Sequence, residues 1–138
     1  FLDAERVATI SPNLRFTDDL LDLCASCDYI TIHVPATPKT KGMIGADEIA
    51  AMKEGAAFLN FSRDTLVDND AMRAGLTSGK VRRYVTDFAT PEVMAMEGAL
   101  VLPHLGASTA EAEENCAEMA VREVMDYLET GKKVHCVN

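Results

Sequence analysis

The 138-residue sequence contains no tryptophan, and aromatic residues make up only 6% of it. Hydrophobic residues nevertheless account for 48%, so the core must be built from alanine, valine, leucine, isoleucine and methionine. Side chains of this kind suit helices that pack on a buried sheet. A chain of this length is about one domain with a single sizeable core.

Basic residues and long apolar runs are also scarce. Lys and Arg number 13 against 22 Asp and Glu, which gives a formal net charge of −9 at pH 7. This balance argues against general binding to nucleic acid or to an anionic membrane surface. No apolar run approaches the roughly 18 residues of a membrane-spanning helix, and the N-terminus has no signal-peptide layout. We therefore expect a cytoplasmic protein with no nucleic-acid or membrane partner.

The four cysteines are too few for a disulfide scaffold in a chain of this length. Cys24 and Cys27 have C-x-x-C spacing but lie late in a predicted helix, whereas a redox pair needs its first thiol at a helix N-terminus. No second pair follows at the spacing of a zinc site. We expect small buried or half-buried thiols and no metal.

Apolar runs alternate with helix signals along the chain. The patterns predict main strands at 28–35, 56–61, 81–86 and 98–103, a short strand at 14–17 and an extended segment at 134–137. They predict helices at 20–24, capped by Asp18 or Asp19, at 46–52, at 69–76, capped by Asp68, and at 109–130, capped by Ser108 with Glu111. This order is typical of an α/β fold with a parallel sheet covered on both faces.

Polar residues follow the main strands at Val34-Pro35, Ser62-Arg63, Asp87 and Pro103-His104. Parallel strands end at one edge of the sheet, where ligands collect, so these segments predict a site. Arg63 can bind a carboxylate through its planar guanidinium. His104 can exchange a proton near physiological pH, with Glu92 as a carboxylate partner. Taken singly, each residue also fits an ion pair, a turn or a solvated loop.

Together these segments resemble the D-isomer-specific 2-hydroxyacid dehydrogenases. The matching residues are His33-Val-Pro35, Thr40-Lys-Gly42, Asn60-Phe-Ser-Arg63, Leu66-Val-Asp68, Ser78-Gly-Lys80, Asp87 and Pro103-His-Leu-Gly-Ala-Ser-Thr109. The resemblance implies a Rossmann-like, doubly wound sheet and an NAD-dependent oxidoreductase that interconverts a D-2-hydroxy acid and its 2-keto acid. The expected substrate is 3-phosphoglycerate, as in serine biosynthesis, with glyoxylate or lactate as alternatives.

The resemblance also assigns roles to individual residues. Arg63 would grip the substrate carboxylate, and His104 would be the acid/base, with Glu92 as its partner. The residues implied to bind NAD are His33, Val34, Pro35, Ser62, Arg63, Asp87, His104, Gly106 and Ala107. Two positions depart from the family pattern: Asp64 replaces the usual glycine, and Glu92 follows a proline instead of preceding one.

The sequence has no Gly-x-Gly-x-x-Gly, the turn whose backbone amides bind the NAD pyrophosphate. We therefore expect residues 1–138 to form the later half of an NAD-binding domain without its first βαβ unit, with 132–138 as a possible return to a substrate domain. Such a piece should bind NAD incompletely and be inactive alone. Its strand at 28–35 would lie at an open sheet edge, which predicts either a homodimer, in which the strand pairs with a second copy, or a rearranged segment that covers it. The alternative is a non-catalytic binding or dimerisation module.

Overall fold

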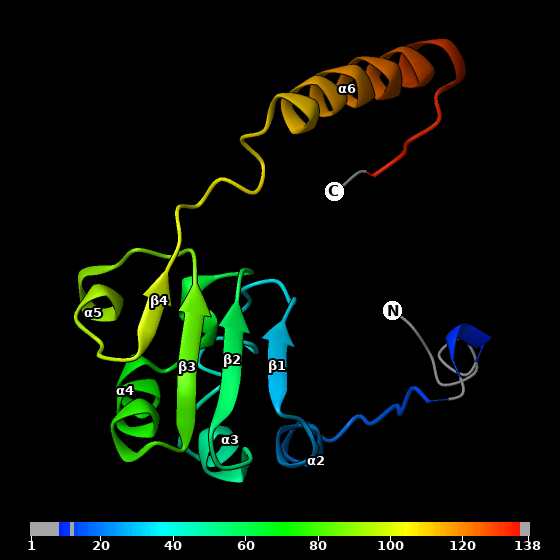
Figure 1. The fold of residues 1–138 in the computed structure, drawn as a ribbon. Coiled ribbons are helices and arrows are strands. Elements are labelled where there is room, and N and C mark those ends of the chain that lie inside the picture. The colour runs from blue at the N-terminus through cyan, green and yellow to red at the C-terminus, as the bar shows by residue number, and fades with distance from the viewer. Residues whose placement is uncertain (1–8, 12, 136–138) are drawn as a thin grey trace. The chain divides into compact units, whose positions relative to one another are not determined.

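The computed structural model describes residues 9–11 and 13–135. The chain divides into two compact units, residues 1–103 and residues 104–138. The first contains a sheet with its helices, and the second contains one long helix, α6, Ala110–Thr130 (Figure 1). Within the described residues, no helix is long and apolar enough to cross a membrane.

The first unit is built on four parallel strands in the order β1-β2-β3-β4 (Figure 1). Their bounds are β1 Tyr29–Ile32, β2 Ala56–Asn60, β3 Val81–Thr86 and β4 Ala99–Val101. The predicted parallel sheet is confirmed, although β1 and β4 are shorter than expected. Residues 14–17 form no strand. Leu14 and Phe16 are both 50% exposed, so this segment has no buried face to pack on a sheet.

Helix α2, Leu20–Ser26, precedes β1, and the helices between the strands are α3 Ala46–Ala51, α4 Asn69–Ser78 and α5 Pro91–Met94. Asp68 caps α4 as predicted, because its side chain accepts hydrogen bonds from the amides of Asp70 and Ala71. The sequence predicts an irregular segment around Pro91, whereas the structure has α5 there. Proline suits the first turn of a helix, where its missing N–H costs nothing, and Thr90 caps this turn.

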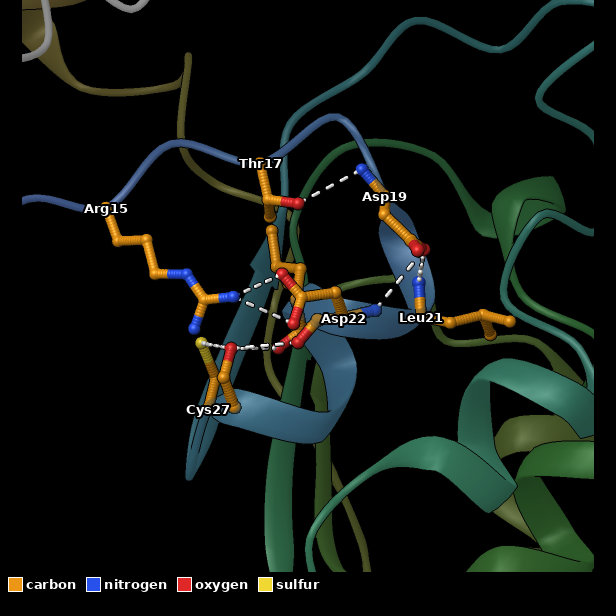
Figure 2. Close-up of polar contacts among 8 residues, drawn as sticks. Arg15, Thr17, Asp19, Leu21, Asp22 and Cys27 are labelled. Carbon is orange, nitrogen blue, oxygen red and sulfur yellow. Dashed lines mark hydrogen bonds and ion pairs between the residues drawn. The ribbon is translucent and has the colours of Figure 1, made fainter.

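Figure 2 shows how α2 begins. The side chain of Asp19 accepts hydrogen bonds from the amides of Leu21 at 2.9 Å and Asp22 at 3.3 Å. Its own amide donates to Oγ1 of Thr17 at 3.2 Å. Arg15 Nη2 lies 2.6 and 2.9 Å from the two carboxylate oxygens of Asp22. Asp19 is therefore the residue that starts this helix.

The cysteines of the described residues carry free thiols in three environments: Cys24 is buried, Cys27 is half-buried and Cys116 is exposed. Burial, with a smaller effect of Glu48, raises the pKa of Cys24 to about 11. The prediction of buried or half-buried thiols is thus confirmed at Cys24 and Cys27 and wrong at Cys116. Cys136 lies outside the described residues.

The core lies against one face of the sheet. Ile30, Phe58 and Tyr84 follow one another across β1, β2 and β3 and are at most 4% exposed. On the opposite face, Tyr29 is 69% and Leu100 is 51% exposed. The described residues thus cover one face of the sheet much more fully than the other, where the pattern predicts two covered faces. β1 lies at the edge of the sheet, as expected.

The second unit confirms the predicted long helix but changes its cap. Oγ1 of Thr109 accepts a hydrogen bond from the amide of Ala112 at 3.1 Å, so the cap is Thr109, one residue after the predicted Ser108. No residue of α6 is buried. Val124 and Leu128, part of its regular apolar pattern, are 58% and 76% exposed. Residues 134–135 form no strand, and 136–137 lie outside the described residues.

Candidate active site

The residues predicted to form the site are divided between the two units. Val34, Ser62, Arg63 and Asp87 follow β1, β2 and β3, whose carboxyl ends share one edge because the strands are parallel. His104 is the first residue of the second unit.

The segment after β2, residues 60–63, is held from inside the fold, and we call it the Arg63 turn. Asn60, the last residue of β2, is 0% exposed. Its Nδ2 donates to the backbone oxygen of Arg63 at 2.8 Å, and its Oδ1 accepts from the amide of Ser62 at 3.1 Å. One buried side chain therefore fixes two peptide groups of the turn.

Further hydrogen bonds tie this turn to its neighbours in the first unit. Oγ of Ser62 donates to the backbone oxygen of Val34 at 2.6 Å, which brings together two residues predicted to contact NAD. The short 3₁₀ helix η1, Asp64–Leu66, follows directly. Its backbone accepts a hydrogen bond from the amide of Gly42 at 2.8 Å, so the loop after β1 is anchored here as well.

The side chain of Arg63 is exposed at this edge. Nη1 donates to the backbone oxygen of Ser62 at 2.6 Å, so the guanidinium folds back over its own turn. A guanidinium carries several N–H donors in one plane and accepts none, which suits it to a carboxylate with two oxygens. The turn is ordered by buried contacts while the charged group at its end remains accessible.

A small cavity of about 200 Å³ lies between the segments that follow β2 and β3. Asp64 and Glu92 both line it, together with Tyr84 and Phe88. Glu92 is exposed in the first turn of α5, and the Asp64 carboxylate accepts from the amide of Thr65 at 2.8 Å. The predicted partner carboxylate thus shares a cavity with the residue that follows Arg63.

The other predicted residues lie near the strand ends or in the second unit. His33 is exposed, and its Nε2 lies 2.8 Å from Oγ1 of Thr31. Asp87 is half-buried directly after β3. The remaining predicted residues are exposed in their respective units: Pro35 in the first, and His104, Gly106 and Ala107 in the second.

Sequence reasoning found Arg63 but not the residues that support it. Tyr84 and Thr86 are 1% and 0% exposed on β3. Burial raises the pKa of Tyr84, and side-chain hydrogen bonds with Asn60 and Thr86 act in the opposite direction. The available signal was the alternation within the strands, which puts residues 58 and 60, and 84 and 86, on one sheet face.

Residues 4–106 match the family described as D-isomer specific 2-hydroxyacid dehydrogenase, NAD binding domain. The chain is 34% identical over 124 residues to D-3-phosphoglycerate dehydrogenase of Methanocaldococcus jannaschii, covering 86% of this chain and 24% of the relative. It is 33% identical over 133 residues to glyoxylate/hydroxypyruvate reductase B of Cronobacter sakazakii, covering 91% and 41%. The chain therefore spans less than half the length of these relatives.

A solved structure of D-mandelate dehydrogenase from Rhodotorula graminis has the same fold. The TM-score is 0.81 with 23% sequence identity, covering 91% of this chain and 38% of that chain. At this identity the likeness concerns the fold alone.

Proposed function

The chain belongs to the D-isomer specific 2-hydroxyacid dehydrogenase family through its NAD-binding domain, and we propose that it works within a longer NAD-dependent dehydrogenase. The reaction is the interconversion of a D-2-hydroxy acid and its 2-keto acid. The preferred substrate pair is 3-phosphoglycerate and 3-phosphohydroxypyruvate, the reaction of serine biosynthesis. The likeness to the Methanocaldococcus jannaschii relative, named a D-3-phosphoglycerate dehydrogenase, supports this substrate.

One observation carries the proposal: an exposed arginine follows a turn that is fixed from the core. The Arg63 backbone accepts from buried Asn60 at 2.8 Å, and its guanidinium stays accessible at the strand ends. A cation on an ordered turn can bind and orient an anionic substrate at little entropic cost. We assign this guanidinium to the carboxylate and adjacent carbonyl oxygen of the 2-keto acid.

Two further side chains complete the proposed chemistry. His104 donates a proton to the keto oxygen during reduction and takes it from the hydroxyl during oxidation. Glu92 orients His104 and favours its protonated form. Bound NAD supplies or accepts the hydride.

The residues after β1, β2 and β3 suit NAD by their chemistry. The Ser62 hydroxyl already donates to Val34 at 2.6 Å, so its oxygen is left to accept from a ribose hydroxyl. The carboxylate of Asp87 can accept from the nicotinamide carboxamide, and Pro35 offers an apolar contact to the adenine. Because the sequence has no Gly-x-Gly-x-x-Gly, we expect the 138-residue chain alone to bind NAD weakly.

A second substrate class has specific support. The Cronobacter sakazakii relative is named a glyoxylate/hydroxypyruvate reductase. Asp64 also places a negative charge beside Arg63, which disfavours a second anionic group on the substrate. Comparing kcat/KM for 3-phosphohydroxypyruvate, hydroxypyruvate and glyoxylate decides between the two classes.

The proposed function is tested by Arg63→Ala and His104→Gln in the complete enzyme, assayed by NADH oxidation with the 2-keto acid. We expect Arg63→Ala to lower kcat/KM by roughly 10-fold to 100-fold, from the loss of a charge-assisted hydrogen bond. His104→Gln should lower kcat by roughly 100-fold or more. Arg83→Ala, which removes an exposed arginine of β3, is the matched control. Unchanged turnover in both site variants, with the fold intact, would leave a binding or dimerisation module as the better account.

Self-association is part of the proposal. β1 pairs with β2 alone among the described residues, so one side of its backbone is open at the sheet edge. Open edges pair readily with another strand, and a second copy of this chain offers an identical one. We propose that the 138-residue chain alone forms a homodimer through this edge, and sedimentation of this chain that gives only monomer across the micromolar range would refute it.

A further inference from the structure

The buried face of β2 and β3 carries polar side chains at the end of the sheet that bears the Arg63 turn. Asn60 lies opposite Thr86 in the strand register, and Phe58 lies opposite Tyr84. The four side chains share one face and are at most 1% exposed. Polar groups are costly to bury unless they are hydrogen-bonded, so a polar cluster here calls for a specific reason.

The cluster connects the interior to two loops of the site. Asn60 contacts the amide of Ser62 and the backbone oxygen of Arg63, as described above. Oγ1 of Thr86 accepts from the amide of Phe88 at 3.3 Å, in the segment that begins with Asp87. Tyr84 lies on the same buried face, next to this pair along β3. One buried network therefore reaches the turns that follow β2 and β3.

The chemistry at Asn60 requires an amide. A neutral carboxamide donates through Nδ2 and accepts through Oδ1, and the Arg63 turn uses one of each. Aspartate would present an acceptor to the backbone oxygen of Arg63, and leucine would satisfy neither group.

We propose that Asn60 is a positioning residue: it fixes the backbone of the Arg63 turn and thereby sets the affinity of the site for the substrate carboxylate. This inference rests on the proposed role of Arg63. It adds that the affinity for substrate depends on a buried asparagine that never touches the substrate.

The first test measures the turn without any catalysis. Amide hydrogen exchange is followed at Ser62 in the native protein, in Asn60→Ala and in the control Phe58→Leu. Phe58 packs on Tyr84, with ring centroids 6.1 Å apart, so its replacement disturbs the same cluster without touching the turn. The exchange rate at Ser62 is expressed as a ratio to the rates of the β2 amides. We expect this ratio to rise at least tenfold in Asn60→Ala and to stay at its native value in Phe58→Leu. An unchanged Ser62 rate in Asn60→Ala overturns the proposal.

The second test separates binding from chemistry. In the complete enzyme, Asn60→Ala should raise KM for the 2-keto acid about tenfold and change kcat much less, because a loosened turn weakens the ground state and transition state alike. Asn60→Ser keeps a small polar side chain but cannot make both hydrogen bonds to the turn, so it provides the readout if Asn60→Ala fails to fold. It should raise KM by roughly threefold, while Phe58→Leu leaves KM unchanged.

The outcomes of the two tests distinguish this inference from the proposed function. If Arg63→Ala leaves KM and kcat unchanged while exchange at Ser62 still responds to Asn60→Ala, the network holds the turn and the assigned role of Arg63 is wrong. A KM that rises equally in Phe58→Leu and Asn60→Ser, in step with lost stability, shows a merely structural cluster and overturns the positioning role.

Discussion

The Arg63 turn and the second unit, which begins at His104, each contain a proposed catalytic residue, but they are built differently. The Arg63 turn is anchored to Asn60, which is 0% exposed, and to the backbone of Val34. In the described part of the second unit, residues 104–135, no side chain is buried. The first residue is therefore positioned by the interior of its own unit. His104 instead precedes α6, a helix that is stabilised by its caps and has no buried residue.

The largest expected effect of this difference is on stability. Phe58→Ala removes a fully buried side chain of β2 and should lower the free energy of unfolding by about 3–5 kcal/mol. Leu128→Ala on α6, where the side chain is 76% exposed, should change it by less than about 0.5 kcal/mol. Urea unfolding of both variants of this chain measures the contrast. Equal losses would mean that α6 contributes to the core.

A smaller effect is expected at the start of α6. Thr109→Ala removes the hydroxyl that accepts from Ala112 and should cost about 1 kcal/mol of helix stability. Ser108→Ala should cost a few tenths at most, since Ser108 is not the cap. Thermal melting followed by circular dichroism measures the loss of helix content in each of the two variants. A larger loss of helix stability in Ser108→Ala than in Thr109→Ala would show that Ser108, the residue predicted from the sequence, is the cap.

The smallest effect concerns pH in the first unit. Burial raises the pKa of Cys24 to about 11 from an ordinary value of 9.0. Below pH 9 the thiol is protonated in both folded and unfolded chains, so its contribution to stability is fully present. Between pH 9 and about 11 only the unfolded chain loses this proton, so stability falls as the pH rises.

The control for this pH dependence is a matched pair of cysteine variants. Cys24→Ala should flatten the decline of the urea midpoint between pH 8 and 10.5, whereas Cys116→Ala, which removes an exposed thiol, should keep the native slope. Tyr84 has a raised pKa too, so a residual decline is expected at the upper end. A native slope in Cys24→Ala would contradict the assignment.

Strands and helices could be predicted where the residues of the segment itself determine the element. β3 has the predicted bounds because its apolar and β-branched residues are flanked by the turn residues Gly79 and Asp87. Residues 14–17 have a comparable composition but no sheet neighbour, which only the tertiary structure supplies. The short helix α5 was missed because Pro91 reads equally as a loop residue or as the first residue of a helix.

For the site, the sequence identified the charged residues but not their supports. Arg63 is predictable because a charge after a buried strand reaches an edge where ligands bind. Asn60 contributes two hydrogen bonds to the same turn, yet in the sequence it is one polar residue at the end of a strand. Its role depends on how the chain turns after β2, which brings the amide of Ser62 and the backbone oxygen of Arg63 to its side chain.

The central claim, that Arg63 binds the substrate carboxylate, is tested most directly by equilibrium binding of oxamate in the presence of NADH. Oxamate has a carboxylate beside a carbonyl group, as a 2-keto acid does, but accepts no hydride, so binding is measured without turnover. Calorimetry on the complete enzyme should show affinity weakened at least about tenfold in Arg63→Ala and unchanged in Arg83→Ala. Native affinity in Arg63→Ala, with the fold intact, would contradict the account.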